Sequence, residues 1–174
     1  MTTTAERLAL TQVKRSDDPL LHDVWQIRAA CAEHLAQRFG DGHWAKVTSV
    51  AQLRRLAGQK HLYAVRRGDQ TLATFVLARK GPPFLQPKLF RDPEAPAAFL
   101  TALAVQPEHQ GHGIGRWSMH QAETIARDWG CRSLRFDAYD HAAGAWPFYD
   151  REGYDRRAKL DVYGVRLIAY ERVL

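Results

Sequence analysis

The spacing of apolar residues up to Gly40 predicts a strand followed by a long helix. Apolar and polar side chains alternate from Arg7 to Val13, a pattern typical of a strand with one buried face. Asp17-Asp18-Pro19 then predicts a helix start, with Asp as the N-cap and Pro in the first turn. The apolar residues that follow at helical spacing are Leu21, Val24, Ile27, Cys31 and Leu35.

A short helix and a hairpin are predicted next. Ser49 is expected to begin the helix and Gly58 to close it. The segments His61 to Arg67 and Thr71 to Arg79 have the composition of strands. They flank Gly68-Asp69, a pair that favours a tight hairpin turn.

The remainder of the chain predicts a loop followed by alternating strands and helices. Lys80 to Pro96 is rich in proline and has no periodicity, so we expect a long surface loop. Ala98 to Val105 is nearly all apolar, as a central buried strand should be. Gly113 to Trp129 carries an apolar stripe and precedes Gly130, which indicates an amphipathic helix. The last expected elements are a strand, a short helix and two closing strands: Ser133–Tyr139, Ala145–Glu152, Tyr154–Val162 and Val165–Val173.

This order of elements predicts a mixed α/β (α+β) fold. The strand-helix-strand-helix unit from Ala98 to Gly153 implies two parallel neighbouring strands in a sheet that is otherwise antiparallel. The length of 174 residues fits one domain, so residues 1–174 are expected to form a single domain. The polar start from Met1 to Arg7 has no apolar leader behind it, and no apolar stretch is long enough to span a membrane. We therefore expect a cytoplasmic protein that does not bind membranes.

The charge balance favours a polyanionic partner without naming it. Lys and Arg outnumber Asp and Glu by 25 to 19, which gives a net charge of +6. The basic residues are scattered, so nucleic-acid binding is disfavoured against a cofactor that carries several phosphates. Cys31 and Cys131 lack CxxC spacing and are interpreted as small core residues. Neither a disulfide framework nor a metal site is expected.

The segment Gln110-Gly-His-Gly-Ile-Gly-Arg116 is the main candidate for ligand binding, because it joins a predicted strand to a predicted helix. Glycines allow close backbone approach, and a helix N-terminus adds free N–H groups, so the segment suits a pyrophosphate. The alternative is a glycine-rich turn that only connects two elements. A P-loop is excluded by the missing Lys, and Arg116 stands where a dinucleotide fingerprint needs its third Gly.

Two motifs together resemble the core of the GNAT (Gcn5-related) N-acetyltransferase superfamily. Gln110-x-x-Gly113-x-Gly115 is similar to the pyrophosphate loop of that family, and Phe148-Tyr149-x-x-x-Gly153-Tyr154 is similar to a second recurring segment. The GHW and DAYD…AG variants resemble an uncharacterised bacterial branch of the family, and this resemblance does not indicate the substrate. The resemblance implies a mostly antiparallel sheet with helices on both faces and a splayed parallel strand pair that forms the cofactor cleft.

The resemblance also implies acetyl-CoA as cosubstrate. The backbone of Leu103, Ala104 and Val105 would pair with the pantetheine arm, and one N–H there would polarise the thioester carbonyl. The alternative is that these three residues are plain core. The residues implied to bind the pyrophosphate are Gln110, Gly111, His112, Gly113, Ile114, Gly115 and Arg116. Ala142 departs from the family, because many members carry an Asn there beside the cofactor; one cofactor hydrogen bond is therefore absent, or Asp140 or His141 supplies it.

Tyr149 and Asp137 are the catalytic candidates that the resemblance implies. Tyr149 matches the tyrosine that protonates the departing thiolate, and a phenol with pKa near 10 keeps its proton at neutral pH. Asp137 matches a strand-borne Glu that acts as base in ribosomal-protein N-terminal acetyltransferases, and its shorter side chain would act through water. The alternatives are an aromatic packing residue and a solvated or salt-bridged Asp. His43, His141 and Glu33 are weaker candidates for the base.

The expected reaction is direct acetyl transfer to a primary amine of unknown identity, carried by a small molecule or a peptide. His43-Trp44 and the loop from Lys80 to Pro96 are candidate borders of the acceptor site, or simply packed surface loops. A catalytically inactive acyl-CoA-binding module and a basic nucleic-acid-binding protein are the competing hypotheses. The sequence leaves a homodimer open.

Overall fold

The computed structural model describes residues 7–174, and within them the predicted order of elements is confirmed. The strands are β1 (Leu8–Gln12), β2 (His61–Arg67), β3 (Gln70–Ala78), β4 (Ala97–Val105), β5 (Ser133–Tyr139), β6 (Asp155–Val162) and β7 (Val165–Val173). The helices are α1 (Asp18–Phe39), α2 (Val50–Gln59), α3 (Ile114–Asp128) and α4 (Trp146–Arg151), with short 3₁₀ turns at His43–Ala45, Pro87–Leu89 and Pro107–His109. The polar start from Met1 to Glu6, on which the expectation of no leader rests, lies outside the described residues.

The two N-terminal helices begin where their capping residues predict. The Asp17 carboxylate accepts a hydrogen bond from the Leu20 N–H at 3.2 Å and caps α1. Ser49 and Gln52 exchange side-chain and backbone bonds in a capping box that begins α2. The prediction that Gly58 closes α2 is wrong, because the helix continues to Gln59 and the Lys60 N–H still bonds to the Leu56 carbonyl at 2.8 Å.

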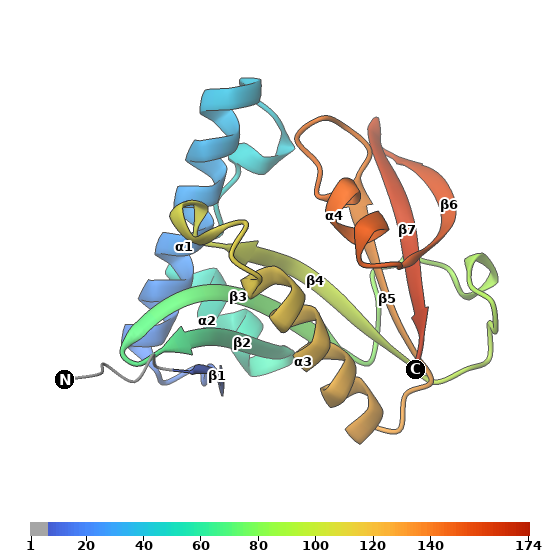
Figure 1. Cartoon of the computed structure of the whole chain (residues 1–174), viewed down its shortest axis with the longest axis horizontal. Helices are drawn as coiled ribbons and strands as arrows, with labels where there is room; N and C mark the ends of the chain where they lie inside the picture. Colours follow the sequence, from blue (N-terminus) through green and yellow to red (C-terminus); the bar gives the residue numbers. More distant parts are fainter. Residues whose placement is uncertain (1–6) are drawn as a thin grey trace.

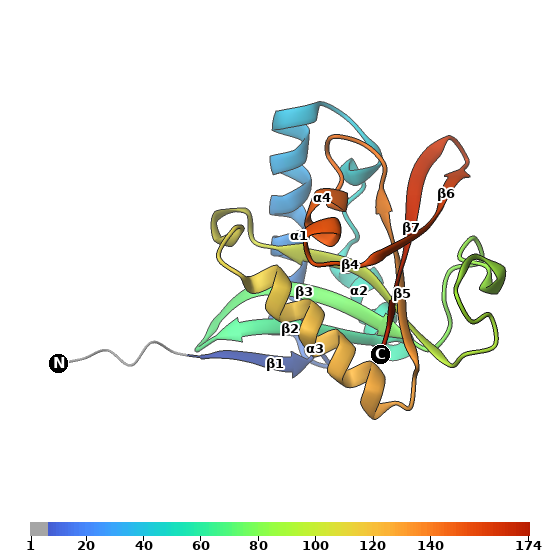
Figure 2. The same ribbon diagram turned by 45° about the vertical axis from the view of Figure 1, so that its right-hand side comes forward.

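The strands form one sheet in the order β1-β2-β3-β4-β5-β7-β6, and within residues 7–174 only β4 and β5 pair in parallel. Alternate residues of β2 face opposite layers, as strand geometry requires. Leu62 and Ala64 pack under α1 and α2, whereas Tyr63 and Val65 pack in the larger core that includes α3. Figures 1 and 2 show α3 crossing one face of the sheet, with α1 and α2 on the other.

The loop from Lys80 to Pro96 packs on the C-terminal strands of the sheet. Its Leu85 and Phe90 are buried against Ala169 of β7. Phe90 also lies under the buried Arg135 guanidinium, 4.4 Å from it. The predicted long loop is confirmed, and its apolar side chains are used to cover the sheet.

The two parallel strands separate soon after they meet. Their pairing runs only from Ala97↔Ser133 to Phe99↔Arg135, and Figure 1 shows β4 and β5 diverging from that end. On its other side β4 carries a bulge opposite β3, where Ala102 has φ 54°. The prediction that all of β4 is buried is wrong past Leu100, because Ala102 is exposed at an edge that no strand covers.

Candidate active site

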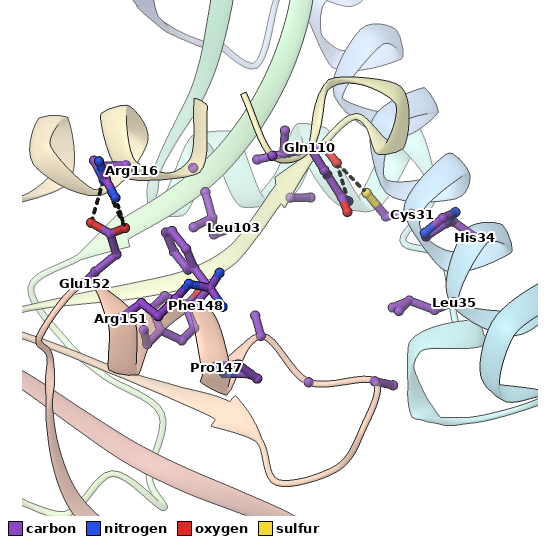
Figure 3. Close-up of a pocket in the computed structure, with 18 of the residues that line it drawn as sticks. Cys31, His34, Leu35, Leu103, Gln110, Arg116, Pro147, Phe148, Arg151 and Glu152 are labelled. Carbon is purple, nitrogen blue, oxygen red and sulfur yellow. Dashed lines mark hydrogen bonds and ion pairs between the residues drawn. The ribbon is translucent and has the colours of Figure 1, made fainter. Parts of the chain in front are cut away.

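A cleft of about 680 Å³ opens where β4 and β5 part. One wall is α1, the floor is the end of β4, and the opposite wall is α4 with the loop before it. Figure 3 shows His34 and Leu35 on the helical side, Leu103 on β4, and Phe148 and Pro147 across from them. The charged residues and histidine that line the cleft are His34, Arg38, Arg116, Arg151 and Glu152. Apart from Arg116–Glu152, these groups give the cleft a basic lining.

The glycine segment closes the cleft at the start of α3. Gly111 and Gly113 have φ values of 77° and 80°, in the left-handed region that glycine adopts without strain. The first backbone bond of α3 runs from the Trp117 N–H to the Gly113 carbonyl at 3.0 Å, so the N–H groups before Trp117 have no place in the helical ladder. A Cβ on Gly115 would lie 3.4 Å from the Phe148 ring, in ordinary van der Waals contact, so Gly115 packs closely on α4. This cradle of free N–H groups suits a diphosphate.

A family model described as the acetyltransferase (GNAT) family matches residues 21–154. The chain belongs to the GNAT family. The matched range begins in α1 and ends after α4, so it contains both walls of the cleft. No curated protein matches the sequence significantly.

Solved GNAT structures share this fold at low sequence identity. An acetyltransferase from Thermus thermophilus is 20% identical, with a TM-score of 0.67 over 99% of this chain and 100% of its own. The PaiA N-acetyltransferase from Thermoplasma acidophilum, solved in complex with coenzyme A, has 13% identity and a TM-score of 0.72 over 97% and 99% of the two chains. The ribosomal-protein-S18-alanine N-acetyltransferase from Escherichia coli has 15% identity and a TM-score of 0.67 over 96% and 94%.

The structure places most of the predicted cofactor residues on the cleft. Those that line it are Leu103, Ala104, Val105, Gln110, Gly111, Gly113, Gly115 and Arg116. Ile114 does not, because its side chain is 1% exposed in the core beneath α3. His112 is exposed, and its Nδ1 lies 2.8 Å from the Gln110 carbonyl oxygen. Ile114 can therefore reach a ligand only through its backbone N–H group.

The carbonyl of Val105 is already engaged. It accepts one hydrogen bond from Gln110 Nε2 at 3.0 Å and one from the Cys31 thiol at 3.2 Å. Gln110 therefore ties its loop to the end of β4, as Figure 3 shows. The interpretation of Cys31 as a plain core residue is wrong, because the side chain is half-buried on the cleft wall. Cys131 is buried, as expected.

Arg116 reaches α4 instead of the centre of the cleft. Its Nε donates to both Glu152 oxygens at 2.9 and 3.0 Å, and its Nη2 donates to Oε1 at 2.9 Å. The dashed lines in Figure 3 mark this pair. These bonds and the Glu152 charge raise the pKa of Arg116. The side chain thus ties α3 to α4 at the border of the cleft.

Sequence reasoning missed the α1 wall. Cys31, His34, Leu35 and Arg38 all line the cleft. Their spacing of three, four and seven residues puts them on one helix face, so the signal was present. That face was interpreted only as apolar packing, because Cys31 and Leu35 extend the stripe that buries Leu21 and Val24.

A second cavity of about 190 Å³ lies beside the cleft and contains both catalytic candidates. It is bordered by consecutive residues of both parted strands, Leu100–Leu103 of β4 and Asp137–Tyr139 of β5. Neighbours along a strand point to opposite faces, so a cavity that both kinds of residue border lies in the gap between the strands. Tyr149 and Leu103 line this cavity and the cleft as well.

Tyr149 enters the gap from the α4 side. Its side chain is 5% exposed and packs against Phe136, with ring centroids 4.6 Å apart. Burial raises the pKa of Tyr149, and the charges of Asp137 and Tyr170 raise it further. The phenol therefore stays protonated throughout the usable pH range and can only donate its proton.

Asp137 enters from the opposite face, since its strand neighbours Phe136 and Ala138 belong to the α3 core. Burial raises the pKa of Asp137 to about 6, against an opposing hydrogen bond from its own backbone. A carboxyl with that pKa is mostly ionised at neutral pH and basic enough to take a proton. Within residues 7–174 no salt bridge involves Asp137, so the salt-bridged alternative has no support.

The other candidates for the general base are less well placed than Asp137. His43 lines the second cavity, and burial together with the His141 charge lowers its pKa. Glu33 lines neither cavity and accepts a hydrogen bond from Gln37 at 3.2 Å. Asp140 pairs with Lys159 at 3.3 Å, and neither Asp140 nor His141 lines the cleft or the second cavity. His141 Nδ1 instead accepts the Ala143 N–H at 3.1 Å.

The loop after β5 is shaped by Gly144, which the sequence analysis did not single out. A Cβ on Gly144 would lie 1.8 Å from the Tyr139 carbonyl oxygen, so no other residue fits there without moving the loop. Gly144 lines both the cleft and the second cavity. By contrast, no residue from Lys80 to Pro96 lines either cavity, and its apolar side chains cover β7, so the structure favours the alternative of a packed surface loop.

Within residues 7–174, no helix is long and apolar enough to cross a membrane, and no group of three or more His, Cys, Asp or Glu side chains is arranged to hold a metal ion.

Proposed function

We propose that the protein is an acetyl-CoA-dependent N-acetyltransferase that passes the acetyl group directly to a primary amine. One observation carries the proposal: the basic cleft with its glycine cradle shares lining residues with a smaller cavity that Tyr149 and Asp137 both line. An acetyl thioester lying in the cleft would therefore have a proton donor, Tyr149, where the two cavities join, and a proton acceptor, Asp137, in the second cavity.

The residues present fit the cosubstrate. The N–H groups at the start of α3 and the glycines before it would hold the diphosphate. The exposed edge of β4 past Phe99 has lost its strand partner, so its backbone is open to an extended chain such as pantetheine. Because the Val105 carbonyl already accepts two bonds, the residues best placed to pair with that chain are Leu103 and Ala104. Bound acetyl-CoA supplies the activated acetyl group.

The protein's own groups would move two protons. Asp137, directly or through a water, takes the proton that the attacking amine loses. Tyr149 gives a proton to the sulfur as it leaves, so that one carbon–nitrogen bond replaces one carbon–sulfur bond and solvent restores both side chains. An N–H of the bulged β4 segment would stabilise the negative charge that develops on the carbonyl oxygen.

A covalent route through Cys31 is not supported. Burial raises the pKa of Cys31 to about 11, so the thiolate that would be the nucleophile is scarce at neutral pH. The thiol also donates its hydrogen to the Val105 carbonyl. Direct transfer needs neither a thiolate nor a metal.

The test is binding and turnover of acetyl-CoA by the purified protein, with two matched glycine variants. Gly113 and Gly130 lie at opposite ends of α3, both have positive φ (80° and 74°), and neither has an atom within 4 Å of an added Cβ. Alanine at either position should cost about 1 kcal/mol of stability. Only Gly113→Ala should weaken acetyl-CoA binding, by tenfold or more in calorimetry. Equal affinity of the two variants, or no acetyl-CoA binding by the folded parent, would refute the proposal.

A further inference from the structure

The second cavity has aromatic walls drawn from two distant segments. His43 and Trp44 come from the connection between α1 and α2, and Tyr139 comes from the end of β5. The His43 and Tyr139 ring centroids are 4.3 Å apart at 74°, and those of Trp44 and Tyr139 are 5.6 Å apart at 60°. We call His43, Trp44 and Tyr139 the aromatic cage. Figure 1 shows the two segments side by side.

The cage is held from behind by the loop after β5. His141 stacks on Tyr139 with ring centroids 5.0 Å apart at 25°, and it also lies 6.0 Å from Trp44. The Gly144 backbone packs directly on the Tyr139 carbonyl. The three rings thus contact one another and His141, and they form one continuous wall of the cavity.

The charge of this cavity is small and negative. Among the residues that line it, Asp137 is the one acid, and no Lys or Arg is present. His43 is also there, but its lowered pKa keeps it neutral near pH 7. One carboxylate balances one ammonium group, so a polyamine or an aminoglycoside would leave further positive charges unpaired. A free amino acid would bring a carboxylate that meets no cation in this cavity.

The volume of the second cavity also favours a small acceptor. At about 190 Å³ the cavity is smaller than the roughly 300 to 1,000 Å³ of pockets for drug-sized ligands. Besides the cage and the two catalytic candidates, it is lined by three leucines, four alanines, one glycine and one polar residue, Thr101. Apolar walls favour a carbon body, and aromatic faces also attract a cation.

We infer that the acceptor is a small primary monoamine with an apolar or aromatic carbon body, seated in the aromatic cage with its nitrogen toward Asp137. The inference rests on the proposed function, since it names the amine for that same site. The carbon body contacts Trp44 and Tyr139, and the amine lies between the Asp137 carboxylate and Tyr149, which lines both the second cavity and the cleft.

The experiment is an acetyl-CoA consumption assay with amines matched in body and charge. Phenethylamine and isopentylamine represent the inferred class. Phenylalanine adds a carboxylate to the first, spermidine adds positive charges, and the tripeptide Phe-Gly-Gly adds a chain. We expect kcat/KM for a monoamine to exceed that of each of the other three by at least tenfold.

Two tryptophan variants separate the cage from general packing. Trp44→Leu should raise the KM for the monoamine about tenfold and leave acetyl-CoA affinity unchanged. Trp129→Leu is the control, because Trp129 lies against His61 and lines neither cavity. It should leave both constants as in the parent.

The outcomes distinguish failure of the acceptor inference from failure of the proposed acetyltransferase function. Higher kcat/KM for the amino acid, spermidine or the peptide, or an unchanged KM in Trp44→Leu, overturns the acceptor inference and leaves the acetyltransferase proposal standing. Acetyl-CoA binding without turnover of any monoamine overturns the inference as well. A folded protein that binds no acetyl-CoA defeats the proposed function, and the inference with it.

Discussion

The cleft and the second cavity lie side by side but are lined by different chemical groups. The cleft is made of backbone N–H groups, glycines and basic side chains, which suit phosphates and an extended chain. The second cavity is made of aromatic rings and one carboxylate. Backbone geometry depends on a local motif, whereas the aromatic walls depend on which side chains the fold brings together. The first kind of site can serve a whole family, and the second can change from one acceptor to another.

The largest expected effect lies where the two cavities join. Tyr149→Phe removes only the hydroxyl, so turnover should fall by roughly 10²- to 10⁴-fold, the usual range for lost acid catalysis. Acetyl-CoA affinity and the melting temperature should be unchanged. Steady-state kinetics and calorimetry on the same preparation test both statements.

Tyr63→Phe is the matched control. Tyr63 stacks on Phe75 in the core, with centroids 5.2 Å apart, and lines neither cavity. It should retain full turnover. Near-normal turnover by Tyr149→Phe would show that Tyr149 is a packing residue, and the two cavities would then share no acid.

Asp137→Asn should lower the rate about 10- to 100-fold near pH 7.5, less than the tyrosine variant, because water can accept the amine proton in part. The parent should lose activity as the pH falls through about 6, where Asp137 takes up its proton. In the variant, which needs the free amine, the rate should instead fall continuously with falling pH, and its deficit against the parent should shrink at high pH. A variant profile identical to that of the parent would place the base elsewhere.

The same variant should be more stable than the parent at neutral pH. The folded-state pKa of Asp137, about 6, lies above its ordinary 3.8, so the folded protein binds this proton more tightly than the unfolded chain does. The resulting stabilisation is complete below about pH 4 and is lost as the pH rises through about 6. At pH 7 to 8 Asp137→Asn should therefore gain on the order of 2 kcal/mol, and the gain should vanish near pH 4. Thermal melts at both pH values measure it.

Gly144→Ala should damage both cavities at once. The added Cβ would lie 1.8 Å from the Tyr139 carbonyl oxygen, so the loop after β5 must shift. We expect a loss of about 1 to 3 kcal/mol in stability and a higher KM for acetyl-CoA and for the amine. Gly58→Ala is the control: it lies within α2 with no atom closer than 3.7 Å, and it should be neutral or stabilising.

The smallest effect is expected at Arg116, although it belongs to the motif. Because its guanidinium is bound to Glu152, Arg116→Gln should change acetyl-CoA affinity by no more than about threefold. A loss beyond tenfold in calorimetry would mean that the guanidinium leaves Glu152 for the phosphates. Binding of acetyl-CoA in the cleft would then depend on a charged side chain as well as on backbone N–H groups.

The order of the elements and the glycine cradle could be predicted from the sequence because both depend on local signals. Asp17, Ser49 and the hairpin turn at Gly68-Asp69 act within a few residues of themselves. The parallel pair could be predicted as well, since a helix must connect such strands. Gly58 misled the prediction because glycine closes a helix only in the left-handed conformation, which it does not adopt here.

The rest depends on contacts between distant segments. The composition of Lys80 to Pro96 does not predict that Phe90 will lie under Arg135, or that the segment will line neither the cleft nor the second cavity. The meeting of His43 with Tyr139 is of the same kind. Helical periodicity predicted the buried stripe of α1, but not that its last turns face an open cleft in place of core.

The left-handed turn at Ala102 has a consequence for how the site meets its ligands. A side-chain-bearing residue with φ 54° costs about 1 to 2 kcal/mol, and the surrounding sheet holds it in place. The orientation of the N–H groups of the bulge is thus set when the protein folds, before any thioester binds. Binding then need not order this segment, and its loss of conformational entropy does not weaken the affinity. Such preorganisation exchanges a little stability of the fold for a site that is ready when the substrate arrives.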